Sequence, residues 1–383
     1  MRWRSRHCSS SPSITGKSRR GRNAMTDLRV LVVGCGNMGA SHAEAYHDMD
    51  GVEICGLVAR GDSRHRLNTR LGGGYPVFSD FAQALTVTRP DAVCLTTWPD
   101  THEAYALAAL AAGCHLFIEK PLATTLVGAE RVIAAARAAG RQLVVGYILR
   151  HHPSWQQFVE LARDLGKPLV MRMNLNQQSH GAMWDVHRNL MQSLSPIVDC
   201  GVHYLDVMCQ MTQSEPVSVS AIGARLSEEL PPEMYNYGQL QVRFADGSVG
   251  WYEAGWGPMI SETAYFVKDV IGPRGSVSIV ARQADADSDN VDGHTRTDSL
   301  RIHSAALDST NQFLQSDRWI DCQDEPDHLA LCLSEQRYFL QAIQDGLDLD
   351  RHWQDALNSL RVVLAADEAV RSRQTVMLGR SSA

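Results

Sequence analysis

Residues 28–39 read Leu28-Arg29-Val30-Leu31-Val32-Val33-Gly34-Cys35-Gly36-Asn37-Met38-Gly39, and this stretch decides the fold of the N-terminal half. An apolar run leads directly into a G-x-G-x-x-G turn, and a helix-forming stretch follows. Gly34 permits a tight turn, Gly36 lets the main chain approach a pyrophosphate, and Gly39 lets the helix pack close to the strand. Because a helix N-terminus favours phosphate, the stretch predicts a dinucleotide site that includes Asn37 and Met38.

Apolar strands alternate with amphipathic helices as far as about residue 147, which is typical of a parallel sheet covered on both faces. Strands are expected at 28–34, 52–59, 92–96, 115–119 and 142–146, with helices between them, such as 101–112 and 126–139. The pattern predicts an α/β fold in which residues 25–149 form a doubly wound Rossmann domain. Its crevice lies at the carboxyl ends of the strands. The residues at those ends that we expect to bind the cofactor are Thr96, Thr97, His102, Glu119 and Lys120.

The pattern changes after a connecting helix at 154–165. Period-two strands follow at 168–176, 217–224, 238–244, 249–254, 264–271 and 276–280, and Asp246-Gly247 is a hairpin signal. Residues 150–383 are therefore expected to form a C-terminal α+β domain for substrate binding and oligomerisation, with a large, mainly antiparallel sheet. Helices at 195–211, 330–344 and 353–371 should cover one face. The segment 283–317 is expected to be a long loop with a short strand at 299–303.

The other face of this sheet is expected to carry Val219, Tyr252, Trp256 and Tyr265. Outward-facing apolar residues make a subunit interface, so we expect a homodimer or homotetramer.

Bulk properties narrow the class of protein. In 383 residues, 44% are hydrophobic and 21% charged, as in soluble globular proteins of about two domains. A net charge of -7 argues against nucleic-acid partners, and the chain lacks an apolar run of about 18 residues that would span a membrane. The nine scattered cysteines indicate a reducing, cytoplasmic location without a metal site. Residues 1–24, rich in Arg and Ser, are expected to form a disordered extension.

The end of the second strand bears on which cofactor is bound. An acidic residue there would accept hydrogen bonds from the ribose 2′-hydroxyl, but the chain has Ala59-Arg60. Alanine removes the repulsion, and Arg60, with help from Arg64, offers planar donors to a 2′-phosphate. This favours NADP(H), with NAD(H) as the second candidate. The alternative is that Arg60 is an ordinary solvated cation.

Two further motifs are candidates for chemistry. In Glu119-Lys120-Pro121 the proline keeps Lys120 out of the α region, which fixes the ammonium group at the crevice unless the motif is only a turn. In the stretch 199–206, a spacing of four places Asp199 and His203 on one face of a mostly apolar helix, and Asp206 lies a turn further. Buried polar groups are costly unless paired or used, although a satisfied core histidine is the alternative.

Together with Thr97…His102 and the run 145–150, these motifs resemble the Gfo/Idh/MocA oxidoreductases from about residue 28 to the C-terminus. The resemblance implies that Lys120, Asp199 and His203 form the catalytic group. Trp98, where the family commonly has proline, and Ala59 depart from the family pattern.

These observations lead to one main hypothesis. The protein is an NAD(P)-dependent oxidoreductase that moves a hydride between nicotinamide and a secondary alcohol or ketone of a sugar, cyclitol or related polyol. His203 would act as base, Asp199 would orient it, and Lys120 would donate a hydrogen bond to the substrate oxygen or itself transfer the proton.

Further polar groups are expected to bind the substrate hydroxyls, from the stretch before the catalytic helix. They are Arg150, His180, Trp184, Asp185, His187 and Arg188. Two alternatives stay open: a reductase of aldehyde or dicarbonyl substrates, and a catalytically idle NADP-binding sensor.

Overall fold

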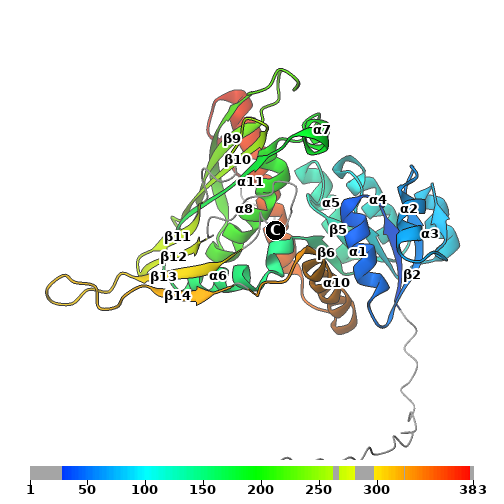
Figure 1. Cartoon of the computed structure of the whole chain (residues 1–383), viewed down its shortest axis with the longest axis horizontal. Helices are drawn as coiled ribbons and strands as arrows, with labels where there is room; N and C mark the ends of the chain where they lie inside the picture. Colours follow the sequence, from blue (N-terminus) through cyan, green and yellow to red (C-terminus); the bar gives the residue numbers. More distant parts are fainter. Residues whose placement is uncertain (1–27, 262–266, 281–296, 323, 380–383) are drawn as a thin grey trace, which may run out of the picture.

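A computed structural model describes residues 28–261, 267–280, 297–322 and 324–379 (Figure 1). The extension predicted at 1–24 lies outside the described residues.

The first sheet has six parallel strands in the order β3-β2-β1-β4-β5-β6. Residues 30–33 of its central strand are buried, as expected for a strand covered on both faces. The strand order reverses between β1 and β4, which is where such sheets bind ligands. The strands are β1 (Leu28–Val33), β2 (Val52–Val58), β3 (Val77–Phe78), β4 (Ala92–Leu95), β5 (His115–Glu119) and β6 (Leu143–Gly146).

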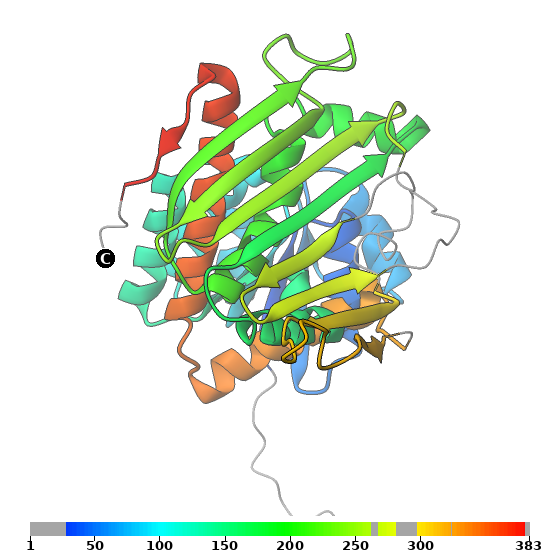
Figure 2. The ribbon, with the colours of Figure 1, turned by 90° about the vertical axis from the view of Figure 1, so that its left-hand side faces the viewer.

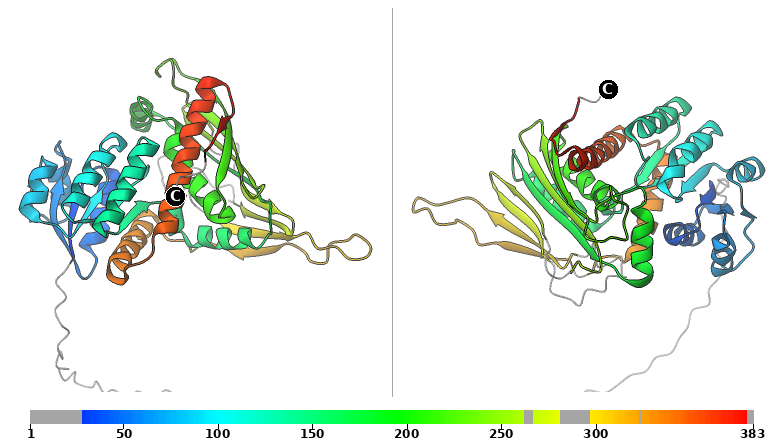
Figure 3. Two further views of the ribbon diagram at one scale, coloured as in Figure 1. Left: turned by 180° about the vertical axis from the view of Figure 1, so that it is seen from behind. Right: turned by 90° about the horizontal axis from the view of Figure 1, so that it is seen from above.

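The helices of this domain connect its strands, with α1 on one side of the sheet and α4 and α5 on the other (Figure 3). They are α1 (Asn37–His47), α2 (Ser63–Arg70), α3 (Phe81–Thr88), α4 (Pro99–Ala111) and α5 (Leu126–Ala139). The bounds of α5 match the prediction because both of its ends are encoded locally. Thr125 caps the first turn by accepting from Gly128 N, and Gly140 ends the helix in a left-handed conformation.

The second sheet has nine strands in the order β14-β13-β12-β11-β7-β10-β9-β8-β15. Strands β7 and β10 run parallel and the other neighbouring pairs run antiparallel, which confirms the predicted mainly antiparallel sheet. The strands are β7 (Val170–Gln178), β8 (Pro216–Ala224), β9 (Tyr237–Phe244), β10 (Val249–Gly257), β11 (Lys268–Gly272), β12 (Gly275–Val280), β13 (Ser299–Ser304), β14 (Arg318–Asp321) and β15 (Val376–Met377).

Helices α6 (Pro153–Arg163), α8 (Pro196–Thr212) and α11 (Asp350–Ser372) pack on one face of this sheet. The helix predicted at 330–344 does not pack on this face. Instead, α10 (His328–Asp345) packs against α1 of the first domain, so the C-terminal part of the chain returns to the dinucleotide half (Figure 1). The segment predicted as a loop before α8 contains another helix, α7 (Gly181–Leu190), and the 3-10 turn η1 (Ile148–Arg150) follows β6.

The opposite face of the nine-stranded sheet is open to solvent (Figure 2). The prediction of which side chains it carries is wrong for Val219, Tyr252 and Trp256, which are buried. Tyr252 stacks on Tyr204 of α8 at 5.0 Å between ring centroids, because this phase of the strand alternation points toward the helices. The fourth predicted residue, Tyr265, lies outside the described residues. A groove on the open face is lined both by polar side chains, such as Arg172 and Arg243, and by apolar ones, such as Val170 and Trp251.

Candidate active site

The glycine loop forms a cradle at the N-terminus of α1. Gly34 has φ +101°, and a Cβ there would lie 2.5 Å from Thr96 O. A Cβ on Gly39 would lie 2.0 Å from Gly34 O, so this position requires glycine for close packing. By contrast, no atom lies within 4 Å of the place where a Cβ on Gly36 would stand. This open space at a helix N-terminus fits a dinucleotide pyrophosphate, with Asn37 and Met38 in the first turn.

The ends of β4 and β5 are tied to this cradle. Thr96 Oγ1 donates to Gly34 O at 3.0 Å, and Thr97 Oγ1 lies 2.6 Å from Thr101 Oγ1. The ring nitrogens of His102 lie 2.8 Å from Pro121 O and 3.0 Å from Thr97 O. His102 is buried, so the structure places it behind the predicted cofactor site, where it joins the two turns that carry Thr97 and Lys120.

At the predicted adenosine end, the two arginines differ. Arg64 Nη1 donates to three carbonyl oxygens of the β2–α2 turn: Ala59 O at 2.8 Å, Arg60 O at 3.1 Å and Gly61 O at 2.6 Å. Its guanidinium group therefore holds the turn together. Arg60 is exposed at the end of β2.

Lys120 and Asp199 bring the two domains together. Lys120 Nζ donates to Asp199 Oδ1 and to Asp199 O, both at 3.1 Å. Burial alone would lower the pKa of Lys120. The carboxylates of Asp199 and Glu119 outweigh burial and raise this pKa above its ordinary value. The Lys120 side chain is therefore an ammonium donor at neutral pH, and it retains 20% exposure.

His203 lies one helical turn beyond Asp199 on α8, with its ring 5.9 Å from that of Tyr147. Burial and the neighbouring Lys120 charge lower the pKa of His203 to about 3. Its Nδ1 is buried without a hydrogen-bond partner among the described residues. The Asp199 side chain contacts Lys120 and Cys200, so the predicted orienting contact from Asp199 to His203 is not the one present in the described residues.

A cavity of about 230 Å³ lies between the domains. It contains five predicted residues: Met38, Glu119, Lys120, Asp199 and His203. His187, a further substrate candidate, lines it as well and stacks on Trp256 with ring centroids 4.2 Å apart.

Sequence reasoning missed several residues that line this cavity. Trp256 Nε1 donates to Gln177 Oε1 at 2.6 Å, and His328 enters from the start of α10. Gln177 and Trp256 pair directly at the carboxyl ends of β7 and β10, the two parallel strands of the second sheet. That parallel pairing would have identified them, but alternation within each strand does not reveal it.

Three predicted substrate-binding residues are used elsewhere. Arg150 binds Asp206 through two hydrogen bonds, of 2.8 and 2.6 Å, and Asp355 at 3.2 Å. Burial raises the pKa of Asp206 to about 6, although Arg150 acts in the opposite direction.

The other two residues lie on α7. Trp184 Nε1 donates to Glu229 Oε1 at 3.3 Å, and Arg188 forms ion pairs with Asp185 and Glu229. The hydrogen-bonding groups of Trp184 and Arg188 are thus used by other protein groups, and neither residue lines the cavity.

The comparisons with known proteins agree with this architecture. Residues 28–147 match the model for the oxidoreductase family with an NAD-binding Rossmann fold, and residues 158–278 match the model for the GFO/IDH/MocA C-terminal domain. The chain is therefore an oxidoreductase with an NAD-binding Rossmann domain. It belongs to the Gfo/Idh/MocA family, which confirms the resemblance carried by its motifs.

Inositol 2-dehydrogenase from Acidiphilium cryptum is 31% identical over 207 residues, which are 52% of this chain and 58% of that protein. The chain thus spans less than two thirds of the length of this relative. Inositol 2-dehydrogenase from Acidothermus cellulolyticus is 26% identical over 265 residues, covering 67% of this chain and 74% of that protein. The crystal structure of GenD2 from gentamicin A biosynthesis, in complex with NAD, has a TM-score of 0.70 at 23% identity and covers 95% of this chain and 100% of its own. It supports the fold.

None of the described helices combines the length and the apolar character that crossing a membrane requires.

Proposed function

We propose that this protein is an NAD(P)-dependent oxidoreductase that interconverts a secondary alcohol and its ketone in a sugar, cyclitol or related polyol. The observation that carries the proposal is the Lys120–Asp199 pair, 3.1 Å between Nζ and Oδ1, inside a cavity lined from both domains. The dinucleotide domain contributes Met38, and the second domain contributes His203. A cavity between two domains with convergent polar groups is a usual place for a cofactor ring and a small polar substrate to meet.

The proton donor in this proposal is Lys120. The bound nicotinamide would supply or accept the hydride, and the residues of this chain would handle the proton and the charge. Because its pKa is raised, Lys120 is protonated and can donate to the oxygen of a ketone that becomes an alkoxide. Asp199 holds the ammonium group through Oδ1 and its main-chain oxygen.

His203 takes a different part from the base we expected. With a pKa of about 3 its imidazole is neutral at working pH, which makes it a weak acceptor of a full proton. A neutral ring with a buried nitrogen that no described residue partners is suited to a hydrogen bond with a substrate hydroxyl. We therefore assign His203 to orienting the reacting carbinol or carbonyl group, beside Lys120.

Other polar groups of the cavity would bind further hydroxyls of the substrate. Gln177, His187 and His328 line it, and Trp256 offers a flat apolar surface beside them. The buried ion pair of Arg150 with Asp206 would support η1, which carries the cavity residues Ile148 and Leu149. Trp184 and Arg188 would act on the substrate indirectly, by fixing α7 and so His187.

NADP(H) is the proposed cofactor, with NAD(H) used less well. Ala59 leaves room at the ribose, and the exposed Arg60 can reach a 2′-phosphate while Arg64 holds the turn. We also propose a cytoplasmic homodimer or homotetramer that uses the open face of the second sheet, without nucleic-acid or membrane partners. The net charge of -7 supports the exclusion of nucleic acid.

The test is turnover of both cofactors with a panel of cyclitols, aldoses and their keto forms. Oxidation of secondary alcohols, with reduction of the matching ketones, would support the proposal. Activity confined to aldehydes or dicarbonyls would replace it with a reductase. Cofactor binding without any turnover would indicate a sensor on the same fold.

A further inference from the structure

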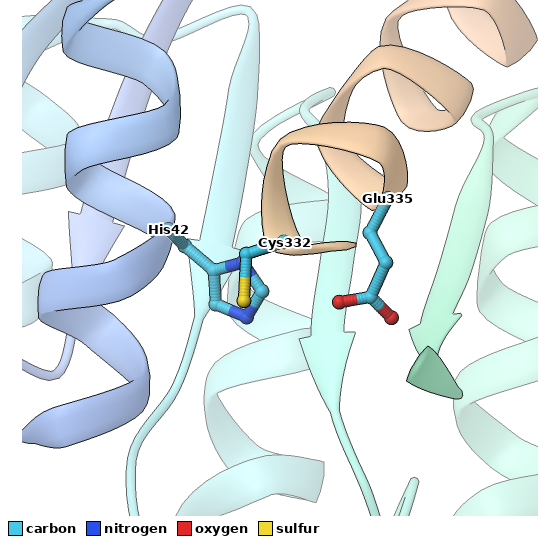
Figure 4. A group of neighbouring side chains, drawn as sticks. All are labelled: His42, Cys332 and Glu335. Carbon is cyan, nitrogen blue, oxygen red and sulfur yellow. The ribbon is translucent and has the colours of Figure 1, made fainter. Parts of the chain in front are cut away.

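A buried group of side chains lies where α10 packs against α1, next to the cavity described above but not among its lining residues. It consists of His42 from α1 and of Cys332 and Glu335 from α10 (Figure 4). All three residues are buried, and one potential ligand atom from each lies within 4.8 Å of the others. Figure 4 shows the thiol beside the imidazole ring and the carboxyl group directed toward them. The group therefore joins a nitrogen, a sulfur and an oxygen donor from the two domains.

The spacing on α10 places several of these donors on one helix face. His328, Cys332 and Glu335 stand at i, i+4 and i+7, and this face of α10 meets α1. His328 Nε2 lies 3.6 Å from Cys332 Sγ. On the opposite side of the group, Glu119 Oε1 lies 2.8 Å from His42 Nε2. A fourth donor is thus available on either flank.

Glu335 provides an independent indication of a ligand. Its side chain is 1% exposed, and its Oε1 has no hydrogen-bond partner among the described residues. An unsatisfied buried polar atom costs about 1–3 kcal/mol, and a bound cation would remove this penalty. Burial and the nearby Glu119 charge raise the pKa of Glu335, and no Lys or Arg of the described residues offsets them, so a cation that bound this carboxylate would come from outside the chain.

We propose that His42, Cys332 and Glu335 bind a zinc-type divalent transition metal ion. A set of one imidazole, one thiolate and one carboxylate suits Zn²⁺, whereas Mg²⁺ and Ca²⁺ require oxygen ligands throughout. Coordination displaces the thiol proton of Cys332 to solvent. The sequence predicted no metal site because its cysteines are scattered, but these ligands come from opposite ends of the chain and only the fold unites them.

His42 can serve as a ligand through a small rearrangement of its partner. Gln336 Nε2 now lies 2.8 Å from His42 Nδ1, and Gln336 Oε1 accepts from the hydroxyl of Tyr46. Rotation of the Gln336 amide by half a turn lets its oxygen accept from a protonated Nδ1. His42 Nε2, which now lies 2.8 Å from Glu119 Oε1, would then exchange that contact for the ion, with Glu119 beside it as the fourth ligand, and the amide would hold the ring in the manner usual for metal-bound histidines.

The consequence of this site is structural. An ion held by α1 and α10 would fix the return of the C-terminal segment to the dinucleotide domain, next to the strand that ends in Glu119. A metal ion that binds the folded state and not the unfolded state stabilises the folded state by mass action. We therefore expect the ion to raise the melting temperature, with a smaller effect on turnover.

The test uses the full chain after treatment with a chelator, with Co²⁺ and Zn²⁺ as probes. We expect one Co²⁺ per chain, visible bands of a tetrahedral ion and a near-ultraviolet thiolate-to-metal band. Zn²⁺ should displace the Co²⁺ with a Kd of about micromolar or tighter. Cys332→Ser should abolish the near-ultraviolet band, and Glu335→Gln should weaken Zn²⁺ binding by at least about 10–100-fold. Cys209→Ser, at a buried thiol on α8, is the matched control and should change neither.

Several outcomes would overturn the proposal. They are the absence of a thiolate band, a Zn²⁺ affinity no better than millimolar, or spectra unchanged by Cys332→Ser. If Cys332→Ser fails to fold, two other measurements decide the question. They are Zn²⁺ binding by Glu335→Gln and the ability of Zn²⁺ to protect the native Cys332 thiol from an alkylating reagent. None of these measurements uses catalytic turnover, so their failure is separate from failure of the proposed reaction.

Discussion

Two cation–carboxylate pairs on the same face of α8 look alike in sequence and differ in the structure. Asp199 pairs with Lys120, and Asp206, seven residues further, pairs with Arg150. The first pair lines a cavity, with side-chain exposures of 20% for Lys120 and 14% for Asp199. The second is closed off, because Asp206 is fully buried and Asp355 completes it. A group available for chemistry has access to a ligand, whereas a group whose hydrogen bonds are already made supports the fold.

The largest expected effect is the loss of Lys120. Lys120→Ala removes the proposed proton donor and the charge that stabilises the developing alkoxide. For a substrate confirmed by the panel, kcat should fall by about two to four decades, the range for a lost proton-transfer or electrostatic group. Cofactor affinity, measured by fluorescence titration, should change little.

The matched control is Lys167→Ala, which removes a lysine paired with Asp246 outside the cavity. It should leave kcat within a few-fold. A Lys120→Ala enzyme with unchanged kcat would require the catalytic assignment to be withdrawn.

Breaking the second pair should act on stability instead. Arg150→Met leaves Asp206 and Asp355 buried without their shared cation, and breaking a buried pair in this way costs about 3–5 kcal/mol. Urea unfolding should show this loss in the free energy of unfolding. The kcat of the remaining folded protein should stay within about tenfold, since Arg150 is not among the residues that line the cavity.

Arg137→Met is the control, because Arg137 forms an exposed pair with Asp350. Exposed pairs contribute about 0–1 kcal/mol. A kcat loss in Arg150→Met as large as that of Lys120→Ala, with normal stability, would return Arg150 to the substrate site.

The contrast between the pairs also shows what the sequence can predict. The cradle was predictable because each glycine acts on its own strand, turn or helix. Gly34 makes the tight turn and Gly39 the close packing that their spacing indicates, and Gly36 leaves open space. Likewise, Lys120 and Asp199 were predicted because each motif lies at the end of a strand or on an amphipathic helix.

The predictions that the structure corrects concern features set by contacts between distant segments. The period-two pattern of β8 and β10 identifies strands, but both phases of the alternation carry large apolar residues, so it could not show that Tyr252 faces α8. The amphipathic pattern of α10 predicts that one face is covered but does not identify the covering element, which is α1. The low pKa of His203 arises from burial and from Lys120, neither of which its own segment reveals.

The pH dependence of stability tests that environment of His203. An unfolded histidine protonates near its ordinary pKa of 6.5, while the folded one stays neutral down to about 3. The unfolded state therefore binds more protons in this window, and stability present above pH 6.5 is lost as the pH falls toward 3. His203→Gln should reduce the loss between pH 7 and 4.5 by about 2–3 kcal/mol.

Urea unfolding at several pH values measures this difference. His65→Gln, at an exposed position on α2, is the control and should follow the original chain. Parallel stability curves for His203→Gln and the original chain would mean that water reaches the imidazole in the folded state. Lys120 contributes no slope in this window, because its raised pKa matters only above about pH 10.

The smallest expected effect concerns Arg60. At the proposed cofactor site, Arg60 and Arg64 differ in the same way as the two ion pairs on α8. Arg64 is bound to three carbonyl oxygens of the turn, whereas Arg60 is exposed and available to a 2′-phosphate. A charge-assisted contact contributes about 1.5–3 kcal/mol when it is formed, and less at an exposed position. Arg60→Ala should therefore weaken NADP(H) binding by about tenfold and leave NAD(H) binding unchanged, as measured by calorimetric titration of both cofactors. Arg64→Ala should weaken both to a similar degree, because it loosens the turn that carries either ribose. Equal affinity of the original chain for the two cofactors would instead show that Arg60 is a solvated surface cation, and the preference for NADP(H) would fall with it.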